Sequence, residues 1–360
     1  MSAKRRVVVW GTGTIGAPGL KAIIEHPELE LVGVHAWSAD KLGVDAGKIA
    51  GTSDTGVITT NDLDALLDLG ADCLAHFGNG ALREAECNAE MIPFLKRGTN
   101  VVTCSQMDIF MPRYGRQEFV RPVAQACEEG KSSIFSTGVE PGYCTTGFPL
   151  SLLSVAGRVD EVHLAEIADV SAYTGVESLK LYGFGEPLDF EPPIYAEGIG
   201  EAWHMSTVRS MAEYLGVELD DVTSIWENAG LDRDQETSFG LIKAGRTMAT
   251  RWTITGLSNG KPVVIYKKIE RLHLDAGNDW EYAKLGAGEA AWRIQIVGQP
   301  SMVSEINADL ASGCAMVALH PVNAIPVVCD AAPGILDPAK LPHFYSRTLG
   351  AGIERAAAVS

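Results

Sequence analysis

Short apolar runs alternate with amphipathic stretches through the first 136 residues of the chain. Residues 6–10 (RVVVW) have the continuous apolar character of a buried strand, and residues 17–25 have helical spacing. The alternation continues with expected strands at 29–35, 57–59, 71–77, 100–104 and 133–136, and expected helices at 62–69, 81–96 and 116–129. This rhythm predicts an α/β domain built on a doubly wound parallel sheet, ending near residue 150.

The pattern changes after about residue 150. A long run at 159–171 alternates with period two, and 201–216 has helical spacing. Two apolar runs at 249–257 and 261–268 are joined by Ser258-Asn259-Gly260, which is typical of a hairpin. A further strand is expected at 291–297, followed by helix-like patterning at 302–328 that is interrupted by Pro321 and Pro326. These features predict a second α+β domain with a mostly antiparallel sheet over residues 151–310.

A glycine-rich turn follows the first expected strand directly and opens the first expected helix. It consists of Gly11, Thr12, Gly13, Thr14, Ile15 and Gly16. In a G-x-G-x-x-G turn of this setting, the first glycine allows the tight turn, the second lets the backbone approach a pyrophosphate, and the third lets the helix pack on the strand. The helix N-terminus adds free N–H groups. The turn therefore predicts a Rossmann domain that binds a dinucleotide.

The end of the second expected strand bears on which dinucleotide is bound. An acidic residue there would bind the adenosine ribose and favour NAD. This chain has no carboxylate at the nearest position; Ser38 could donate to a 2′-phosphate and Lys41 could neutralise it, although Asp40 is close by. We expect NADP(H), with NAD(H) still open. Ser38 could equally be an ordinary loop serine.

Three loops follow the carboxyl ends of strands, where a doubly wound sheet binds its ligands. The first two begin at His76-Phe77-Gly78 and at Thr103. The third is Thr137-Gly138-Val139-Glu140-Pro141-Gly142-Tyr143, in which Glu140 and Tyr143 are candidates to meet the substrate or a nicotinamide. Glu140 could equally cap a helix or form a surface ion pair.

Two further groups of residues are candidates for chemistry. Cys104 or Cys144 could act as the nucleophile of an acylating aldehyde dehydrogenase, but such a thiol needs a positioned base and the sequence identifies none. In the 159–171 run, alternation would place Asp169, Ser171 and Tyr173 on one face and Glu166 on the other. Either face could be a polar wall for a substrate or a solvated surface.

Composition limits the classes of partner. The 360-residue chain has a net charge of −17 and a pI of about 4.9, which argues against a broad nucleic-acid or anionic-membrane surface. No apolar run of 18 residues, signal peptide or metal-ligand spacing is evident, so we expect no membrane span and no metal. The seven scattered cysteines suit reduced thiols and a cytoplasmic location.

Four segments give the chain a family resemblance: VVVWGTGTIG, GTNVVTCSQ, STGVEPGY and HPVNAIPVVCDAAPGI. With them the chain resembles the dihydrodipicolinate reductase-like oxidoreductases that include 2,4-diaminopentanoate dehydrogenase and the native amine dehydrogenases. The resemblance implies a Rossmann domain, an α/β substrate domain, a C-terminal segment (311–360) that returns to the first domain, and a homodimer. It also implies reversible hydride transfer between NAD(P)H and a C=N or C=O carbon. His76, Phe77 and the loop containing Gly138 would lie near the nicotinamide.

One departure from the family bears on the reaction. Where amine-dehydrogenating members resemble TCEEL, this chain has Thr103-Cys104-Ser105-Gln106-Met107. Gln106 can form hydrogen bonds but cannot accept a proton at neutral pH, so general-base catalysis from this loop is lost. We therefore expect an NAD(P)-dependent oxidoreductase for a small carbonyl, alcohol, imine or amine, with Gln106, Glu140, Tyr143, Glu166 and Tyr173 as candidate catalytic residues. The alternative is a non-catalytic NADP(H)-binding protein or sensor.

Overall fold

The computed structural model describes residues 3–80, 83–173, 175–195, 199–238, 240–283, 289–350 and 353. The chain divides into two compact units, and each is considered by itself. The first unit comprises residues 1–106, 118–138 and 315–360; the second comprises 107–117 and 139–314. The chain therefore crosses between units more often than the three predicted segments, 1–150, 151–310 and 311–360, imply.

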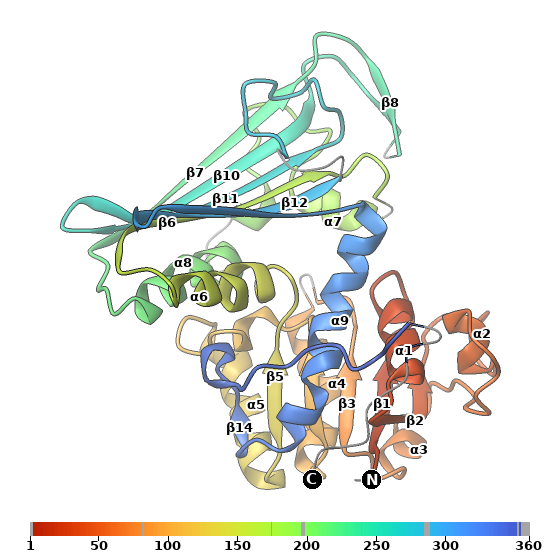
Figure 1. Cartoon of the computed structure of the whole chain (residues 1–360). Helices are drawn as coiled ribbons and strands as arrows, with labels where there is room; N and C mark the ends of the chain where they lie inside the picture. Colours follow the sequence, from red (N-terminus) through yellow and green to blue (C-terminus); the bar gives the residue numbers. More distant parts are fainter. Residues whose placement is uncertain are drawn as a thin grey trace. The chain divides into compact units, whose positions relative to one another are not determined.

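The first unit contains a six-stranded sheet in which every pairing is parallel (Figure 1). Its strand order is β14-β5-β4-β3-β1-β2. The strands are β1 (Arg5–Trp10), β2 (Leu29–His35), β3 (Cys73–His76), β4 (Asn100–Thr103), β5 (Ser133–Ser136) and β14 (Gly334–Ile335). The continuous apolar run of β1 is buried on both faces, as expected for a strand covered on each side. The predicted doubly wound α/β architecture is confirmed.

Helices connect the parallel strands of the first unit. They are α1 (Gly16–Glu25), α2 (Ala46–Ala50), α3 (Leu63–Leu67), α4 (Glu84–Lys96) and α5 (Gln117–Gly130). The segment 57–59, expected as a strand, contributes only an isolated bridge between Ile58 and Asp45. The order of the strands reverses between β1 and β3. A sheet of this type binds its ligands beyond the carboxyl ends of the strands at that point.

Helix α9 (Leu310–Cys329) continues through both prolines that were expected to interrupt it. By length and composition it is also apolar enough to cross a membrane. However, Ala318, Val322, Ile325 and Val328 are fully or almost fully buried in the same apolar core as strand β1, as in the core helix of a globular domain. Burial of these side chains offsets the hydrogen bonds that the prolines remove. After α9 the chain forms η5 (Pro338–Lys340).

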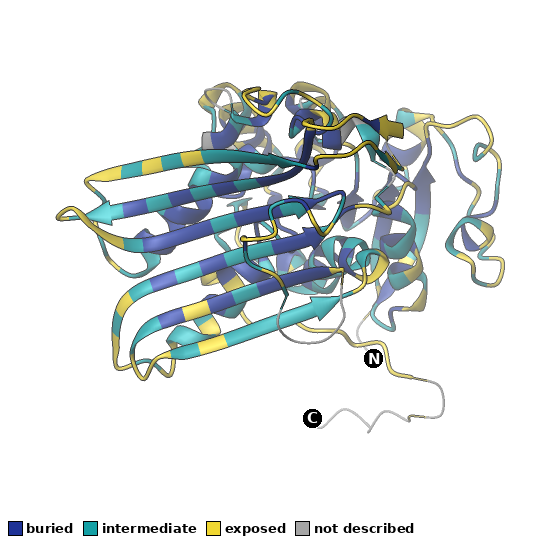
Figure 2. Cartoon of the chain, turned by 90° about the horizontal axis from the view of Figure 1, so that it is seen from above, coloured by how far each residue is buried: buried dark blue, intermediate teal, exposed yellow. Residues whose placement is uncertain are grey.

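The second unit contains a mixed six-stranded sheet of order β13-β12-β6-β11-β10-β7 (Figure 2). Only the β6–β11 pairing is parallel. The strands are β6 (Arg158–Asp169), β7 (Asp221–Gly230), β10 (Thr247–Ser258), β11 (Lys261–Arg271), β12 (Ala290–Gln299) and β13 (Met302–Ala308), and β8 (Gln235–Thr237) pairs separately with β9 (Gly240–Ile242). The predicted α+β domain with a mostly antiparallel sheet is confirmed.

Two segments of the second unit differ from the sequence-based expectation. Residues 302–308 were grouped with a helix but form β13, which pairs with β12, and β7 was not anticipated. The predicted hairpin is present: Asn259 and Gly260 adopt φ of 51° and 70° between β10 and β11. The helical elements are η1 (Met107–Ile109), η2 (Tyr143–Gly147), α6 (Phe148–Leu153), α7 (Val176–Leu181), η3 (Pro193–Tyr195), η4 (Glu201–Met205) and α8 (Ser206–Tyr214).

Candidate active site

The glycine-rich turn follows β1 at the point where the strand order reverses. A Cβ on Gly11 would lie 2.8 Å from the Phe77 carbonyl oxygen, and a Cβ on Gly16 would lie 2.1 Å from the Gly11 oxygen. Internal packing therefore explains why both positions are glycine. In contrast, a Cβ on Gly13 would meet nothing within 4 Å. The absence of a side chain at Gly13 instead leaves room for a ligand to approach the backbone.

Helix α1 begins directly after this turn. Ile15 makes no capping hydrogen bond through its side chain, and the first helical turn contains no acidic residue. Thr14 is exposed at the open side of the turn, whereas Thr12 is buried. Free N–H groups and the positive end of the helix dipole favour an anion at such a terminus. The turn and the helix together fit the pyrophosphate of a dinucleotide.

The end of β2 carries aromatic rings in place of a carboxylate. His35 stacks on Trp10 with 3.6 Å between ring centroids, and burial lowers the pKa of His35 to about 4, so the ring is neutral. Trp37 lies edge-on to both rings and is 47% exposed. Ser38 is exposed, and the Lys41 ammonium donates to the Thr12 carbonyl at 2.6 Å. The structure thus brings Lys41 to the glycine-rich turn and adds Trp37, which sequence reasoning missed.

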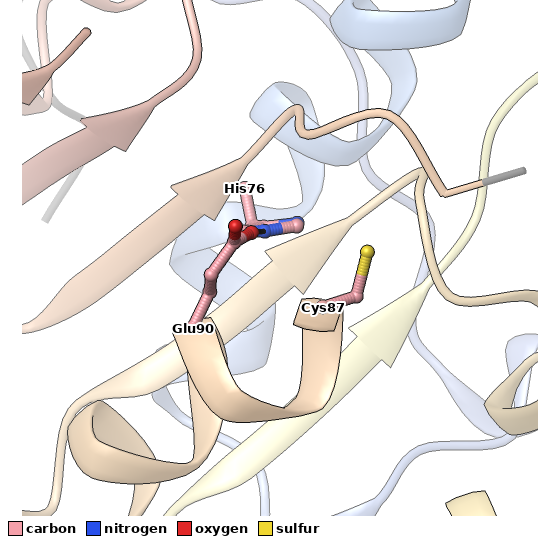
Figure 3. A group of neighbouring side chains, drawn as sticks. All are labelled: His76, Cys87 and Glu90. Atoms are coloured by element: carbon pink, nitrogen blue, oxygen red, sulfur yellow. Dashed lines mark hydrogen bonds and ion pairs between the residues drawn. The ribbon is translucent and has the colours of Figure 1, made fainter. Parts of the chain in front are cut away.

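The loops after β3 and β4 are joined through His76. Its side chain is fully buried, with Nδ1 3.2 Å from the Thr103 hydroxyl and Nε2 2.7 Å from a Glu90 carboxylate oxygen (Figure 3). Phe77 lies against the glycine-rich turn, and half-buried Gly78 accepts a hydrogen bond from Ser105 at 2.6 Å. Among the residues expected near the nicotinamide, Phe77 contacts the glycine-rich turn directly. The side chains of His76 and Thr103 instead form hydrogen bonds with other side chains of the first unit.

Gln106 lies in the loop after β4, where the family resemblance led us to expect a glutamate. It is fully buried, and its side-chain nitrogen donates to the Glu84 carbonyl at 3.1 Å and to Asn88 Oδ1 at 2.8 Å. The Asn88 amide is held in this orientation because its own nitrogen donates to the Phe119 carbonyl at 2.8 Å. Gln106 therefore needs a donor at this atom, which a carboxylate does not supply.

Introducing a glutamate at this position is expected to destabilise the protein. In Gln106→Glu, an anionic oxygen would face two acceptors in a buried site, so we expect the free energy of unfolding to fall by about 1–3 kcal/mol or more. Urea unfolding measures the loss. Gln106→Met, which leaves the same acceptors unpaired without adding a charge, should lose less. An unchanged unfolding midpoint for Gln106→Glu would contradict this account of the side chain.

A row of charged and aromatic side chains runs across neighbouring strands on one face of the second sheet, called here its inner face. Glu166 on β6 pairs in register with Lys268 on β11, and this pair is flanked by Trp292 on β12 and Trp252 on β10. Trp226 on β7 completes the row beyond Trp252. All of these positions share a face because side chains alternate along each strand. The row therefore combines a charged pair with aromatic walls.

Lys268 is the centre of a buried ionic cluster, defined here as Glu140, Glu166, His204, Lys268 and Glu270. Its ammonium lies 2.7 Å from Glu166, 3.3 Å from Glu270 and 4.0 Å from Glu140. His204 lies between Glu140 (Nδ1 to Oε1, 3.3 Å) and the Tyr182 hydroxyl (Nε2, 3.1 Å). The cluster side chains are 3–15% exposed. The ionic cluster therefore contains three carboxyl groups, one ammonium group and one imidazole.

The environments of two carboxyls in the cluster shift their pKa values in opposite directions. Burial raises the pKa of Glu166 to about 7, with Lys268 lowering it and Glu140 and Glu270 raising it. Burial would also raise the pKa of Glu140, but His204 and Lys268 outweigh burial and hold it below its usual value. Burial opposes the charge on Lys268, yet Glu166 and Glu270 raise its pKa well above normal. Glu166 can therefore gain or lose a proton near neutral pH, while Glu140 stays ionised.

The remaining predicted residues of the Gly138–Tyr143 loop are placed separately. Gly138 is buried and Glu140 belongs to the ionic cluster, so Glu140 is not a surface residue. Tyr143 stacks on Phe148, and burial raises its pKa. Cys144 is buried, and burial together with Glu166 and Glu140 raises its pKa well above the range of a reactive thiolate.

Cys104 is likewise a poor nucleophile. Burial raises its pKa to about 12, so its thiol stays protonated at neutral pH. Neither of the two cysteines that the acylating aldehyde dehydrogenase alternative requires is activated. The structure therefore gives that alternative no support.

Tyr173 lies outside the sheet row. Strand β6 ends at Asp169, and Tyr173 follows in a turn in which its N–H donates to the Val170 carbonyl at 3.0 Å. The prediction that Asp169, Ser171 and Tyr173 share one strand face is wrong, because the chain turns before reaching the last two. Tyr173 packs at the edge of an apolar core that contains Ile167 and Val170.

Comparisons with known proteins agree with both units. Residues 5–104 match the family model of the dihydrodipicolinate reductase N-terminus, and residues 148–350 match that of the 2,4-diaminopentanoate dehydrogenase C-terminal domain. An amine dehydrogenase from Streptomyces virginiae is 32% identical over 345 residues, covering 93% of this chain and 95% of that protein. Solved structures share the fold as well, among them those of two dehydrogenases.

The first of these structures is an amine dehydrogenase from Mycobacterium smegmatis. It is similar with a TM-score of 0.76 at 18% identity, covering 96% of this chain and 98% of that chain. The second is a scyllo-inositol dehydrogenase from Lactobacillus casei, solved with bound NAD(H) and scyllo-inositol. Its TM-score is 0.52 at 12% identity, covering 90% of this chain and 89% of that chain.

The fold, the glycine-rich turn and the matched families define the class of protein: an NAD(P)-dependent oxidoreductase with a Rossmann unit. Within that class, the chain belongs to the 2,4-diaminopentanoate dehydrogenase and amine dehydrogenase family. The family resemblance predicted from the sequence is confirmed. Hydride chemistry is supplied by the nicotinamide when it is bound, and the protein supplies binding, orientation and electrostatics.

Proposed function

We propose that the chain catalyses reversible hydride transfer between a nicotinamide cofactor and the C=N carbon of a small imine, with the corresponding amine as the reduced product. The observation that carries this proposal is Glu166, a buried carboxyl with a pKa of about 7 beside Lys268. It provides an acid–base group, whereas the Gln106 amide in the loop after β4 cannot accept a proton. Glu166 would donate a proton during reduction and accept one during oxidation.

The charge of the ionic cluster supports an amine rather than an acid as substrate. Three carboxylates surround one lysine, and Glu270 Oε2 has no hydrogen-bond partner among the described residues. Such a site attracts an ammonium or iminium group and repels a substrate carboxylate. Trp226 and Trp292, in the same row, suit uncharged substituents and can stack on a cation, whereas Trp252 is 1% exposed and packs among other rings of the unit.

For the cofactor we propose NADP(H), with NAD(H) as the alternative. The end of β2 offers Ser38 and Lys41 and no carboxylate before Asp40. Trp37, exposed beside Gly11, supports stacking of an adenine ring at the same place. Lys41 would then neutralise a 2′-phosphate within reach of the glycine-rich turn.

The test is a turnover panel in which ketones, with and without ammonium, are reduced by NADPH or NADH, and primary amines are oxidised in the reverse direction. We expect cofactor oxidation that requires ammonium, faster turnover with NADPH, and little activity on keto acids. Ketone reduction independent of ammonium would instead indicate a ketoreductase. Tight NADPH binding with no turnover on any substrate would favour a non-catalytic binding protein or sensor.

We also propose that the chain forms a homodimer through the outer face of the second sheet. Ile225 on β7 and Val303 on β13 are 57% and 65% exposed, on the face opposite the ionic cluster. Exposed aliphatic side chains on a broad sheet face suit a second copy of the same surface. Light scattering of the purified chain would measure its mass. The cytoplasmic location remains a prediction.

A further inference from the structure

Three metal-ligating side chains meet in the first unit, outside the ionic cluster. His76 is the last residue of β3, while Cys87 and Glu90 lie one turn apart on α4 (Figure 3). One donor atom from each lies within 4.8 Å of the other two. His76 and Cys87 are fully buried, and the Glu90 side chain is 13% exposed. A histidine, a cysteine and a glutamate at spacings of 11 and 3 residues match none of the common zinc-ligand patterns, so no metal was expected from the sequence.

We propose that His76, Cys87 and Glu90 form a binding site for Zn²⁺. An imidazole nitrogen, a thiolate and a carboxylate are ligands that zinc accepts, whereas Mg²⁺ and Ca²⁺ prefer oxygen alone. Ligand atoms around a tetrahedral zinc stand roughly 3.3–3.7 Å apart, given bond lengths of about 2.0–2.3 Å. Side-chain shifts of about 1 Å would bring the three donors to that spacing. The thiolate and the carboxylate together would neutralise the dication.

Two surrounding contacts support this site. Thr103 holds His76 Nδ1 at 3.2 Å and so aims Nε2 at the group, as outer-shell partners do for metal-binding histidines. Gly78 lets the backbone pass close by, because a Cβ there would lie 2.8 Å from His76 Cε1 and 3.3 Å from Glu90 Oε2. Without metal, Nε2 bonds to Glu90, and the Cys87 thiol donates to the Asn79 carbonyl at 3.7 Å.

Binding of Zn²⁺ breaks these two contacts and releases one proton. The S–H bond of Cys87 breaks and a Zn–S bond forms, and the thiol proton leaves to the buffer. His76 would donate its lone pair to the ion from Nε2, with Nδ1 facing Thr103. No oxidation or reduction takes place. The bound ion would draw together the end of β3 and helix α4.

The site is coupled to the dinucleotide turn through Phe77, the residue after His76. Phe77 would obstruct any side chain at Gly11 or Gly19, so it packs tightly against that turn. A shift of His76 toward a metal therefore moves the backbone on which the turn rests. We expect bound Zn²⁺ to change the affinity of the protein for NADPH by fivefold or more, within the usual range of about 5- to 150-fold for coupled sites.

The test is metal binding by the full chain in a non-chelating buffer with a phosphine reductant. Wild type should bind one Zn²⁺ in competition with a chromophoric chelator, release one proton, and give a sulfur-to-cobalt charge-transfer band with Co²⁺. Cys87→Ser and Glu90→Gln should each weaken Zn²⁺ binding by more than the roughly 10- to 100-fold cost of losing an outer-shell partner. Cys127→Ser, which alters another fully buried thiol on α5, should bind like wild type.

Several outcomes would overturn the proposal. Equal Zn²⁺ affinity in wild type and Cys87→Ser, or a Co²⁺ spectrum without the thiolate band, would exclude the site. If Cys87→Ser does not fold, as judged by circular dichroism in a chelator, Glu90→Gln decides, since its side chain is partly exposed. Identical NADPH dissociation constants with and without saturating Zn²⁺ would remove the coupling to the dinucleotide turn.

Discussion

Replacing Lys268 with methionine is expected to lower the free energy of unfolding by about 3–5 kcal/mol at pH 8, because it leaves buried carboxylates without their cation. Lys268 is 9% exposed and contacts Glu166, Glu270 and Glu140. The loss should shrink as the pH falls. Lys268 lowers the pKa of Glu166, so the variant raises that pKa above about 7, further from the unfolded value near 4.5. A carboxyl whose pKa rises on folding lowers the free energy of unfolding once the pH exceeds its unfolded pKa. The decrease grows with pH and is complete above the folded pKa, so little of it is present near pH 5.

Denaturant unfolding at pH 8 and pH 5 measures this dependence. Lys267→Met is the matched control, since Lys267 is the neighbouring residue on the same strand but is 31% exposed and pairs with Glu281 on the other face. It should cost about 0–1 kcal/mol at either pH. Equal losses for the two variants, or a Lys268→Met loss that does not diminish at pH 5, would mean that Lys268 does not hold the carboxylates in place.

The Rossmann unit could be predicted from sequence because its signals are local. Continuous apolar runs identify strands that are buried on both faces, and the glycine-rich turn lies within six residues of β1. The second sheet was harder. Strand β7 places half-buried Ser224, Trp226 and Asn228 on its inner face, so this face does not appear as an apolar stripe. Likewise, β13 lies directly before α9, and its residues were absorbed into the helical pattern.

The ionic cluster could be predicted only in part. Glu140 and Glu166 were candidates because of their loop and strand positions, but His204, Lys268 and Glu270 were not anticipated. Lys268 lies 102 residues from Glu166 along the chain, and the two meet only through the register of a parallel strand pairing. No spacing rule connects residues at that separation. A polar residue at every second position of β11 (Tyr266, Lys268, Glu270) was the one available signal.

The interpretation of Gln106 also needed the structure. From sequence, the exchange of a family glutamate for glutamine indicates only lost acid–base chemistry. The structure gives a positive reason for the amide, because both neighbours of its nitrogen, Glu84 O and Asn88 Oδ1, are acceptors. An amide at Gln106, which cannot exchange a proton, and a near-neutral carboxyl at Glu166 together support the proposal that Glu166 is the acid–base group.

Replacing Glu166 with glutamine is expected to reduce kcat by about 10²- to 10⁴-fold, the usual contribution of a general acid or base. The amide keeps the size of the side chain and can still bond near Lys268, but it cannot exchange a proton. The pH profile should change as well. In wild type, reduction needs protonated Glu166 and should decline as the pH rises through about 7, whereas amine oxidation needs the carboxylate and should decline as the pH falls through about 7. Both limbs should be missing in the variant.

Glu270→Gln is the control for this prediction because it removes a carboxylate from the same lysine, at 3.3 Å, without removing Glu166. If the role of Glu166 is proton transfer, Glu270→Gln should lose less activity and should keep a pH dependence, with its midpoint shifted below 7 because Glu270 raises the pKa of Glu166. If the two variants lose activity equally and keep the same pH profile, the cluster acts only through its charge. Glu166→Asp separates these cases further. It keeps a titrating carboxyl, so its activity should still change with pH, with a shifted midpoint, even if turnover falls.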